Sequence, residues 1–291
     1  IMMMVMIIML IPAAQVSAQR VNAVLDTRLS LQEGTKTDAP EQGTVEFRNV
    51  SFHYPSSDKD VLCNISFTAK QGEAVAFIGA TGSGKTTLVS LIARFYDATS
   101  GQVLVDGQDV REYTFDALYD RIGYVTQKAI LFSGDIRENV LFGESRAEAS
   151  EDNVREALDL AQATEFVEKL PGGIEAPIAE GGTNVSGGQK QRISIARALA
   201  RKPEILVFDD SFSALDYRTD AKLRAGLEER LKHTTRLIVA QRIGTIRNAD
   251  KIIVLDEGRA VGVGTHEELM QSCPVYQEIA RSQLSKEELE A

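Results

Sequence analysis

One glycine-rich segment constrains the fold of this chain more than any other feature. The segment reads Gly79-Ala80-Thr81-Gly82-Ser83-Gly84-Lys85-Thr86, and a short, mostly apolar stretch at residues 73–78 precedes it. The stretch that follows has the spacing of an amphipathic helix, with apolar side chains at Leu88, Leu91, Ile92 and Phe95. Glycines let the loop backbone curl with its N–H groups pointing inward, and the helix adds its positive end. The sequence therefore predicts a strand, a phosphate-binding loop and a helix in that order.

The polar side chains of this loop match the needs of phosphate binding. Lys85 supplies a positive charge to the β- and γ-phosphates of a nucleotide, and Thr86 supplies a hydroxyl ligand to Mg²⁺. We expect the rest of the phosphate cradle to comprise Gly79, Thr81, Gly82, Ser83, Gly84 and Thr87. These side chains predict a bound nucleotide and Mg²⁺.

Strand and helix patterns alternate along the remaining sequence. Apolar or alternating stretches predict strands at residues 45–52, 65–69, 103–105, 122–125, 205–209, 237–240 and 251–255. Helical periodicity predicts helices at residues 154–170, 189–199 and from residue 267 onward. This alternation predicts an α/β layered fold.

Two carboxylates, Asp209 and Asp210, follow the apolar residues Ile205-Leu206-Val207-Phe208. A carboxylate at the end of a buried strand is costly unless it is paired or bound to a metal. Beside a phosphate-binding loop, the natural partner of Asp209 is the Mg²⁺ shell, usually through water. We therefore expect Asp209 to contribute to a magnesium site together with Thr86.

The first residues form an unbroken apolar run, residues 1–11, and helical periodicity continues over residues 18–31. The run is shorter than the roughly 20 apolar residues of a membrane span, lacks the basic region of a signal peptide, and does not begin with Met. We interpret it as the end of a transmembrane helix, the alternative being a buried core segment. The predicted organisation is this helix and its cytoplasmic extension at 1–31, a linker at 32–43, a nucleotide-binding domain at 44–282 and an acidic tail at 283–291.

Composition narrows the classes of partner. Asp and Glu total 42 against 32 for Lys and Arg, which gives a formal net charge of -10. This charge argues against a nucleic-acid partner, because the phosphate backbone attracts basic surfaces. Cys63 and Cys273 match no metal or redox spacing, which is typical of incidental thiols in a reducing compartment.

A second short motif, Val185-Ser186-Gly187-Gly188-Gln189, lies between the phosphate-binding loop and the two carboxylates. Together these motifs resemble the ATP-binding cassette (ABC) of membrane transporters, and the resemblance runs from about Val45 to Ser282. It implies a P-loop NTPase of the ABC type, with a RecA-like core, an antiparallel β-subdomain and an inserted α-helical subdomain. It also implies that Ser186, Gly187, Gly188 and Gln189 contact the γ-phosphate of ATP held by a second cassette, so that two chains enclose two nucleotides.

The resemblance assigns further positions. Tyr54 matches the aromatic residue that stacks on adenine, and Gln127 matches the glutamine that contacts Mg²⁺ and the attacking water. Ser213-Ala214-Leu215-Asp216 matches the loop through which the two sites communicate. Residues 131–143 resemble the segment of exporters that faces the membrane domain, and residues 180–184 resemble the loop that precedes the signature of exporters. These matches imply a half-transporter in the cell membrane, with its own upstream membrane domain and with its cassette on the cytoplasmic side.

Two positions depart from the family pattern. Asp210 stands where the family usually has a catalytic Glu, and Gln241 stands where it usually has a His. Asp is one methylene shorter than Glu, and a misplacement on the scale of 1 Å can cost about 100-fold in rate. Gln cannot carry a charge or transfer a proton as His does. We therefore expect Asp210, Gln241 and Gln127 to form a catalytic pocket that hydrolyses ATP slowly.

The signature, in contrast, is intact, which favours a heterodimer with a non-identical half-transporter whose own nucleotide is completed by Ser186. The alternatives are a homodimeric exporter with two slow sites, a soluble ABC protein that acts on ribosomes or DNA, and a purely regulatory ATP-binding subunit. The exported substrate of such a transporter is a hydrophobic, drug-like, lipid or peptide molecule, and no residue of this chain specifies which.

Overall fold

The computed structural model describes residues 2–27, 30–143 and 150–284, and the chain divides into one unit up to Gln32 and a second from Glu33. The first unit contains one helix, α1 (Met2–Leu25), with Pro12 inside it. By length and composition α1 is sufficient to cross a membrane, with a mean hydropathy of 1.7 in an 18-residue window. The apolar run at its start was predicted to be too short for this, but the helix continues past Pro12 to Leu25. Arg28 and Leu29 of the predicted extension lie outside the described residues.

The second unit is built on a sheet of order β12-β11-β3-β10-β9-β6. All neighbouring strands run parallel except β12, which is antiparallel to β11. Both β9 and β10 are buried along their whole length, as central strands covered on both faces usually are. The strand bounds are β3 (Ala74–Ile78), β6 (Ile122–Val125), β9 (Ile205–Asp209), β10 (Thr235–Val239), β11 (Lys251–Asp256) and β12 (Arg259–Gly264).

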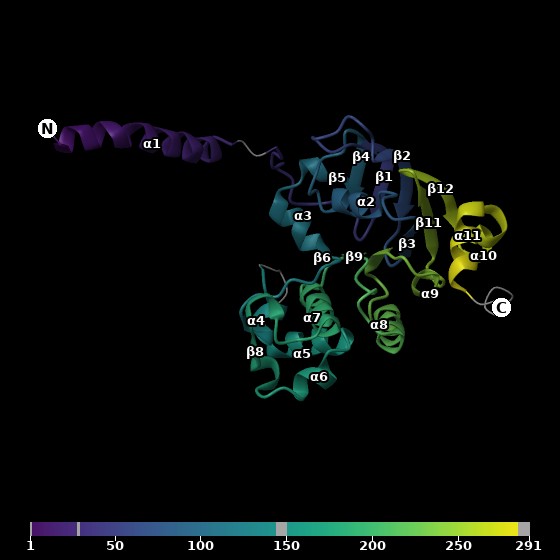
Figure 1. Ribbon diagram of the computed structural model, residues 1–291. Helices are drawn as coiled ribbons and strands as arrows, with labels where there is room; N and C mark the ends of the chain where they lie inside the picture. The colour runs from purple at the N-terminus through teal and green to yellow at the C-terminus, as the bar shows by residue number, and fades with distance from the viewer. Residues whose placement is uncertain (1, 28–29, 144–149, 285–291) are drawn as a thin grey trace. The chain divides into compact units, whose positions relative to one another are not determined.

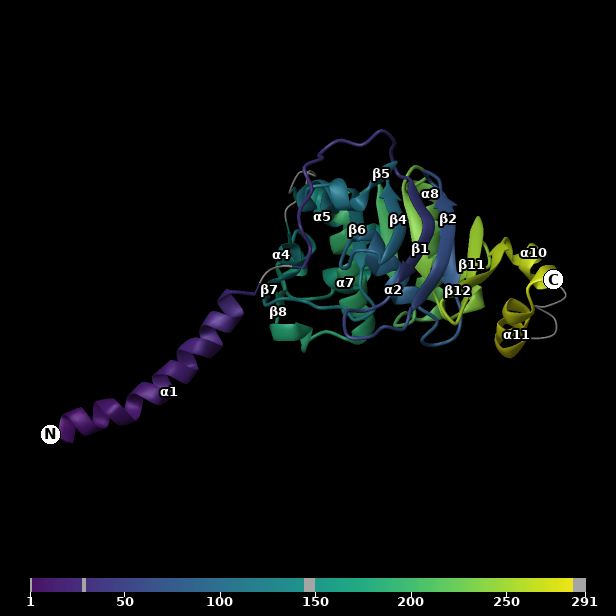
Figure 2. The same cartoon turned by 90° about the horizontal axis from the view of Figure 1, so that it is seen from above.

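A smaller antiparallel sheet of order β2-β1-β4-β5 lies beside the first (Figure 2). Its strands are β1 (Val45–Phe52), β2 (Leu62–Ala69), β4 (Ser100–Val105) and β5 (Gln108–Asp109). In β1 and β2 buried residues mostly alternate with exposed ones, so one face of the sheet is buried. The ring of Phe67 lies 5.3 Å from that of Phe77 in β3, and these rings belong to a core that includes the apolar residues Leu88, Val89, Leu91 and Ile92 of α2 (Lys85–Ile92). The phosphate-binding loop is therefore fixed between two rigid sheets.

A helical subdomain is inserted between β6 and β9 (Figure 1). It contains β7 (Gly134–Asp135), α4 (Ile136–Val140), α5 (Glu151–Leu160), α6 (Thr164–Glu168), η2 (Gly173–Glu175), β8 (Pro177–Ile178), η3 (Glu180–Gly182) and α7 (Gly187–Ala200). One helix was predicted over residues 154–170, but the structure has α5 and α6 there. The backbone leaves the helical conformation at Gln162, which has a left-handed φ of 57°, and the Ala163 N–H donates to the Leu158 carbonyl at 2.7 Å. This left-handed C-terminal cap ends α5 although apolar residues continue at helical spacing.

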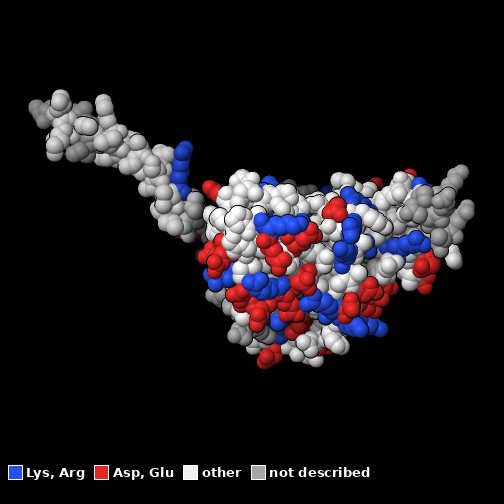
Figure 3. All heavy atoms as spheres, turned by 90° about the horizontal axis from the view of Figure 1, so that it is seen from below, with Lys and Arg blue, Asp and Glu red and all other residues white. Residues whose placement is uncertain are grey.

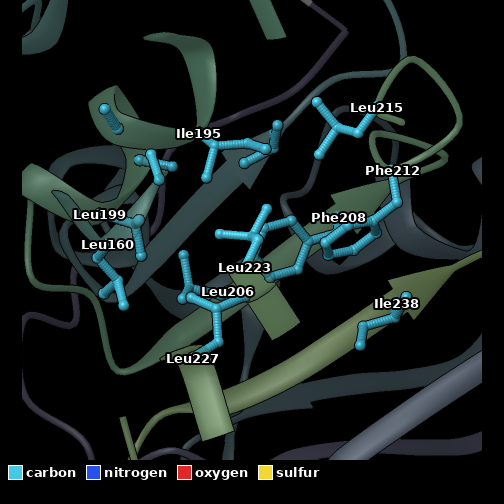
Figure 4. Packing of buried hydrophobic residues seen from close by; sticks show 14 of the residues in the cluster. Leu160, Ile195, Leu199, Leu206, Phe208, Phe212, Leu215, Leu223, Leu227 and Ile238 are labelled. Carbon is cyan, nitrogen blue, oxygen red and sulfur yellow. The ribbon is translucent and has the colours of Figure 1, made fainter. Parts of the chain in front are cut away.

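The subdomain shares one core with the central sheet. Figure 4 shows side chains of α5, α7, β9 and α8 (Tyr217–Arg230) converging around Leu206 and Phe208. The remaining helices are η1 (Val110–Glu112), α3 (Phe115–Arg121), α9 (Ile243–Ile246), α10 (His266–Ser272) and α11 (Pro274–Gln283). The α/β fold with a parallel core, an antiparallel sheet and an inserted helical subdomain is thus confirmed.

Residues 32–43 were interpreted from composition as a linker, but from Glu33 onward they belong to the second unit. The Gly34 N–H donates to the Tyr113 carbonyl at 2.9 Å, and the Lys36 N–H donates to the Glu112 carbonyl at 2.8 Å. The Arg121 guanidinium donates to the Thr37 carbonyl at 3.1 Å. The compact domain therefore extends to Glu33. At the other end, Gln283 closes α11, and most of the predicted acidic tail, residues 285–291, lies outside the described residues.

Candidate ATP site

The phosphate-binding loop connects β3 to α2, and Lys85 folds its side chain back over it. The Lys85 Nζ donates to the Gly79 carbonyl at 2.9 Å, to the Ala80 carbonyl at 2.8 Å and to Ser83 Oγ at 3.3 Å. Burial lowers the pKa of the Lys85 ammonium, and the carboxylates of Asp210 and Asp209 oppose this shift. A phosphate placed in the loop would offer this cation a charged partner in place of neutral carbonyls.

Close packing explains the glycine that begins the loop. A Cβ at Gly79 would lie 2.0 Å from the carbonyl oxygen of Leu255. No side chain fits at that distance, so the loop runs directly against β11. Beside the loop lies a pocket with a volume of about 290 Å³, lined by Val61, Thr81, Gly82, Gly84, Lys85, Thr86, Thr87, Gln127, Asp210, Val239 and Gln241. Most of the predicted phosphate-binding residues thus meet the three predicted catalytic residues in one place, whereas Gly79 and Ser83 are not among the described residues that line the pocket.

Asp209 is buried at the end of β9 and has two hydroxyl partners. Thr86 Oγ1 donates to Asp209 Oδ1 at 2.9 Å, and the Tyr124 hydroxyl donates to Asp209 Oδ2 at 3.4 Å. Burial raises the pKa of the Asp209 carboxyl, and the same effect raises the pKa of Tyr124. Tyr124 was not predicted as a site residue, although it lies three positions before Gln127. Tyr124 reaches Asp209 because of the register in which β6 pairs with β9, and the sequence does not specify that register.

The carboxylate of Asp210 accepts hydrogen bonds from two side-chain amides. Gln127 Nε2 donates to Asp210 Oδ2 at 3.0 Å, and Gln241 Nε2 donates to the same oxygen at 2.7 Å. The backbone of Asp210 has a φ of 48°, a left-handed conformation that is uncommon outside glycine and is often found at functional sites. Gln127 and Gln241, predicted to form the catalytic pocket with Asp210, therefore both contact its carboxylate directly, although the three residues come from separate segments of the chain.

Tyr54 lies beside the pocket on the antiparallel sheet side. Its hydroxyl shares a hydrogen bond of 2.9 Å with Thr87 Oγ1, and its ring lies edge-on to Tyr96 at 5.2 Å. The Phe52 ring lies 4.9 Å from the same ring and 5.5 Å from Tyr96, so the three rings form one cluster. These contacts fix the ring, and adenine stacking on Tyr54 remains a prediction.

The signature residues form the start of α7. Ser186 is the N-cap: its Oγ accepts from the Gln189 N–H at 3.3 Å, while Gln189 Oε1 accepts from the Ser186 N–H at 2.8 Å. This capping box holds the hydroxyl at the positive end of a 14-residue helix. Ser186, Gly187, Gly188 and Gln189 are not among the described residues that line the 290 Å³ pocket. The signature thus lies outside the pocket of its own chain in the described part of the structure, and its contact with a second cassette's nucleotide stays a prediction.

An aromatic cluster with an exposed surface occupies the helical subdomain at the segment that resembles exporters. The rings of Phe132 and Phe142 stack at 4.2 Å, and the Arg197 guanidinium lies 5.4 Å from each ring centroid. Arg197 also donates to the Asn139 carbonyl at 2.7 Å and to the Ile130 carbonyl at 2.9 Å. Ile130, Phe132 and Phe142 remain 56%, 43% and 50% exposed. The cluster is rigid yet apolar, which is typical of a protein contact surface.

Fold and pocket together define a nucleotide-binding domain of the ABC type. The chain belongs to the ABC transporter family, whose sequence pattern matches residues 62–213. It is 45% identical over 287 residues to an uncharacterized ABC transporter ATP-binding protein of Mycobacterium tuberculosis, which covers 97% of this chain and 49% of the relative.

Two further similar proteins are a flippase and an exporter. The ATP-dependent lipid A-core flippase of Escherichia coli is 38% identical over 270 residues, covering 93% of this chain and 46% of the flippase. The solved structure of a bacterial Atm1-family ABC exporter with ATP bound superposes with a TM-score of 0.87 at 34% identity, covering 95% of this chain and 48% of the exporter. The chain spans about half the length of the curated relatives it matches.

Proposed function

We propose that this chain is the ATP-hydrolysing subunit of an ABC exporter, with its cassette on the cytoplasmic side of the cell membrane. ATP-driven pairing of two cassettes would be coupled to export of a hydrophobic, drug-like, lipid or peptide substrate. The observation that carries the proposal is the meeting of Lys85, Gln127 and Asp210 in one pocket while Ser186 lies outside it. The similarity to a flippase and to an Atm1-family exporter supports the direction of transport. The length and apolar character of α1 support the membrane location.

The residues around Asp209 suit Mg²⁺. The groups that meet there are a buried carboxylate, the Thr86 hydroxyl and, beside them, the Gln127 amide, all of which offer oxygen atoms. Hard oxygen donors are the ligands that Mg²⁺ prefers, and a buried carboxylate whose pKa is raised by burial gains from a cation. Thr86, Gln127 and Asp209 would hold the ion. When bound, Mg²⁺ supplies positive charge that neutralises the phosphates during transfer.

The pocket of this chain is proposed to hydrolyse ATP slowly. The Asp210 carboxylate is shorter than that of Glu, and its Oδ2 already accepts hydrogen bonds from both Gln127 and Gln241. The two amides hold this oxygen in place, but the shorter side chain keeps it farther from the attacking water, and Gln241 has no ionisable group to assist. Because the signature is intact, the partner is proposed to be a non-identical half-transporter whose nucleotide is completed by Ser186.

The distribution of surface charge bears on whether a nucleic acid could be a partner. Lys and Arg side chains are interspersed with Asp and Glu on the face shown in Figure 3. With a net charge of -10, electrostatic attraction to a nucleic-acid backbone has no basis on this face. A function on the membrane with a protein partner is therefore favoured over one on ribosomes or DNA.

Nucleotide binding by Lys85 tests the proposal. Lys85→Ala removes the cation that the loop presents to the phosphates, so we expect most of the affinity for Mg-ATP to be lost. Lys169→Ala is a matched control, because Lys169 is exposed and pairs only with Glu165 among the described residues. Equilibrium titration of the full chain with a fluorescent ATP analogue measures both. Unchanged affinity in Lys85→Ala would refute the assigned site.

A further inference from the structure

The side chain of Gln283, the last residue of α11, bonds to the loop that carries Gln241. Gln283 Nε2 donates to the Gln241 carbonyl at 2.7 Å, and Gln283 Oε1 accepts from the Ile243 N–H at 2.9 Å. The Gln283 amide thus bonds to Gln241 and to Ile243, the residues on either side of Arg242 in the short connection between β10 and α9. No resemblance assigns a role to Gln283, and the sequence around it contains no motif.

The connection needs an external partner because α9 is only four residues long. Its N-cap, Arg242, makes no side-chain capping bond, so the N–H of Ile243 would otherwise be one of the unpaired donors at a helix start. A helix this short does not hold its own conformation. Gln283 supplies the missing acceptor and at the same time satisfies the Gln241 carbonyl. Its two hydrogen bonds therefore fix the backbone on both sides of Arg242.

On the other face of the same loop, the Gln241 side chain reaches the catalytic pocket. Its Nε2 donates to Asp210 Oδ2 at 2.7 Å. The loop is also held by the Ala240 N–H, which donates to the Phe77 carbonyl at 3.2 Å, but this contact lies before Gln241. A continuous series of contacts therefore runs from α11 through Gln241 to the Asp210 carboxylate.

We propose that Gln283 is a positioning residue for ATP hydrolysis: it sets the direction in which Gln241 presents its amide to Asp210. The inference rests on the proposed hydrolysis of ATP in this pocket. It makes the end of α11 part of the structure that controls turnover, although α11 does not line the pocket. Changes to α11 should consequently alter the rate of the chemical step more than the binding of nucleotide.

The test compares two glutamines of α11. Gln283→Ala should lower kcat for this pocket about five- to 25-fold with little change in KM for ATP, since each of its two hydrogen bonds contributes roughly a factor of five. Gln277→Ala is the matched control: Gln277 lies on the same helix as Gln283, and its Nε2 donates to the carbonyl of Met270 in α10 at 2.9 Å, away from Gln241. Gln283→Glu keeps the acceptor for Ile243 but loses the donor, and should give an intermediate loss. Where the partner is a different chain, its own site is disabled in all samples.

A double-mutant cycle separates positioning from general stability. In a Gln241→Ala background no amide remains to be positioned, so adding Gln283→Ala should have no further effect on kcat. Equal losses in Gln283→Ala and Gln277→Ala, or full additivity with Gln241→Ala, would overturn the inference while leaving the ATPase in place. If the unaltered full chain and every variant hydrolyse no ATP while binding it normally, the proposed hydrolysis in this pocket is wrong and the inference falls with it.

Discussion

Ser186→Ala should be far more damaging to the assembled transporter than Asp210→Asn. In the structure, Ser186 caps α7 through a reciprocal pair of hydrogen bonds with Gln189. Its removal therefore has two separable costs. The loss of an N-cap destabilises a protein by about 1 kcal/mol. The loss of a hydroxyl aimed at a γ-phosphate in the transition state costs roughly 3 kcal/mol, or about 100-fold in rate.

A matched capping box elsewhere in the chain isolates the first cost. Thr265 caps α10 in the same way, with Thr265 Oγ1 accepting from the Glu268 N–H at 3.3 Å and Glu268 Oε2 accepting from the Thr265 N–H at 2.9 Å. Thr265→Ala should lower the free energy of unfolding by about as much as Ser186→Ala. It should leave turnover nearly unchanged, because α10 does not line the pocket. The difference in rate between the two variants then measures the contribution of the Ser186 hydroxyl alone.

The assay is steady-state ATP hydrolysis and transport by the assembled complex, with each substitution made separately. In the proposed heterodimer Ser186 completes the partner's competent site, whereas Asp210 serves only the slow one. Asp210→Asn should therefore change overall turnover by only a few-fold. If Asp210→Asn is as severe as Ser186→Ala, the heterodimer proposal is refuted and Asp210 acts as a working catalytic base, as in a homodimer.

Three further predictions concern the pocket, the backbone and pH. Asp210→Glu combined with Gln241→His should raise single-turnover hydrolysis in this pocket, and an unchanged rate would locate the defect elsewhere. Gly101→Ala should cost about 3 kcal/mol or more in urea unfolding, because its Cβ would lie 2.3 Å from a backbone oxygen at a φ of +79°; Gly173→Ala, which meets open space, should cost only about 1 kcal/mol. Burial raises the pKa of Asp106 from 3.8 to about 7, so the folded state retains a proton that the unfolded state releases. Protonation of Asp106 therefore adds to the free energy of unfolding. This contribution is fully present below pH 3.8 and is lost as the pH rises through about 7. Asp106→Asn should flatten the resulting decline of the urea midpoint, and a decline as steep as that of the unaltered chain would contradict this cause.

Sequence predicted those parts of the site that are built from consecutive residues. The phosphate-binding loop and the signature each depend on local chemistry, namely glycines for the backbone and a helix start for the positive end. For the same reason β1 and β6 begin and end where their apolar patterns do. Local patterns were less informative at Gln162, where a left-handed residue ends α5 within a stretch that still has helical periodicity.

The missed contacts all depend on tertiary structure. Tyr124 reaches Asp209 only because β6 pairs with β9 in one register, and Gln283 reaches Gln241 across a connection that includes α9, β11, β12 and α10 before α11. Residues 33–43 are polar, as linkers are, but their backbone groups find partners at Glu112 and Tyr113. The polar composition of this segment therefore indicated a linker, because composition does not show which backbone groups of the folded domain lie opposite a segment.

The Asp210 pocket and the Ser186 signature differ in how they are built, and this difference bears on the proposal that this chain pairs with a non-identical partner. The Asp210 carboxylate depends on Gln127 and Gln241, and through Gln241 on Gln283, so it draws on four distant segments. The Ser186 hydroxyl is held by Gln189 within a single helical turn. A substitution at position 210 or 241 therefore alters the first arrangement without disturbing the second. Loss of catalytic residues from the pocket is structurally compatible with a fully formed signature, which is the combination that a chain serving its partner's nucleotide requires.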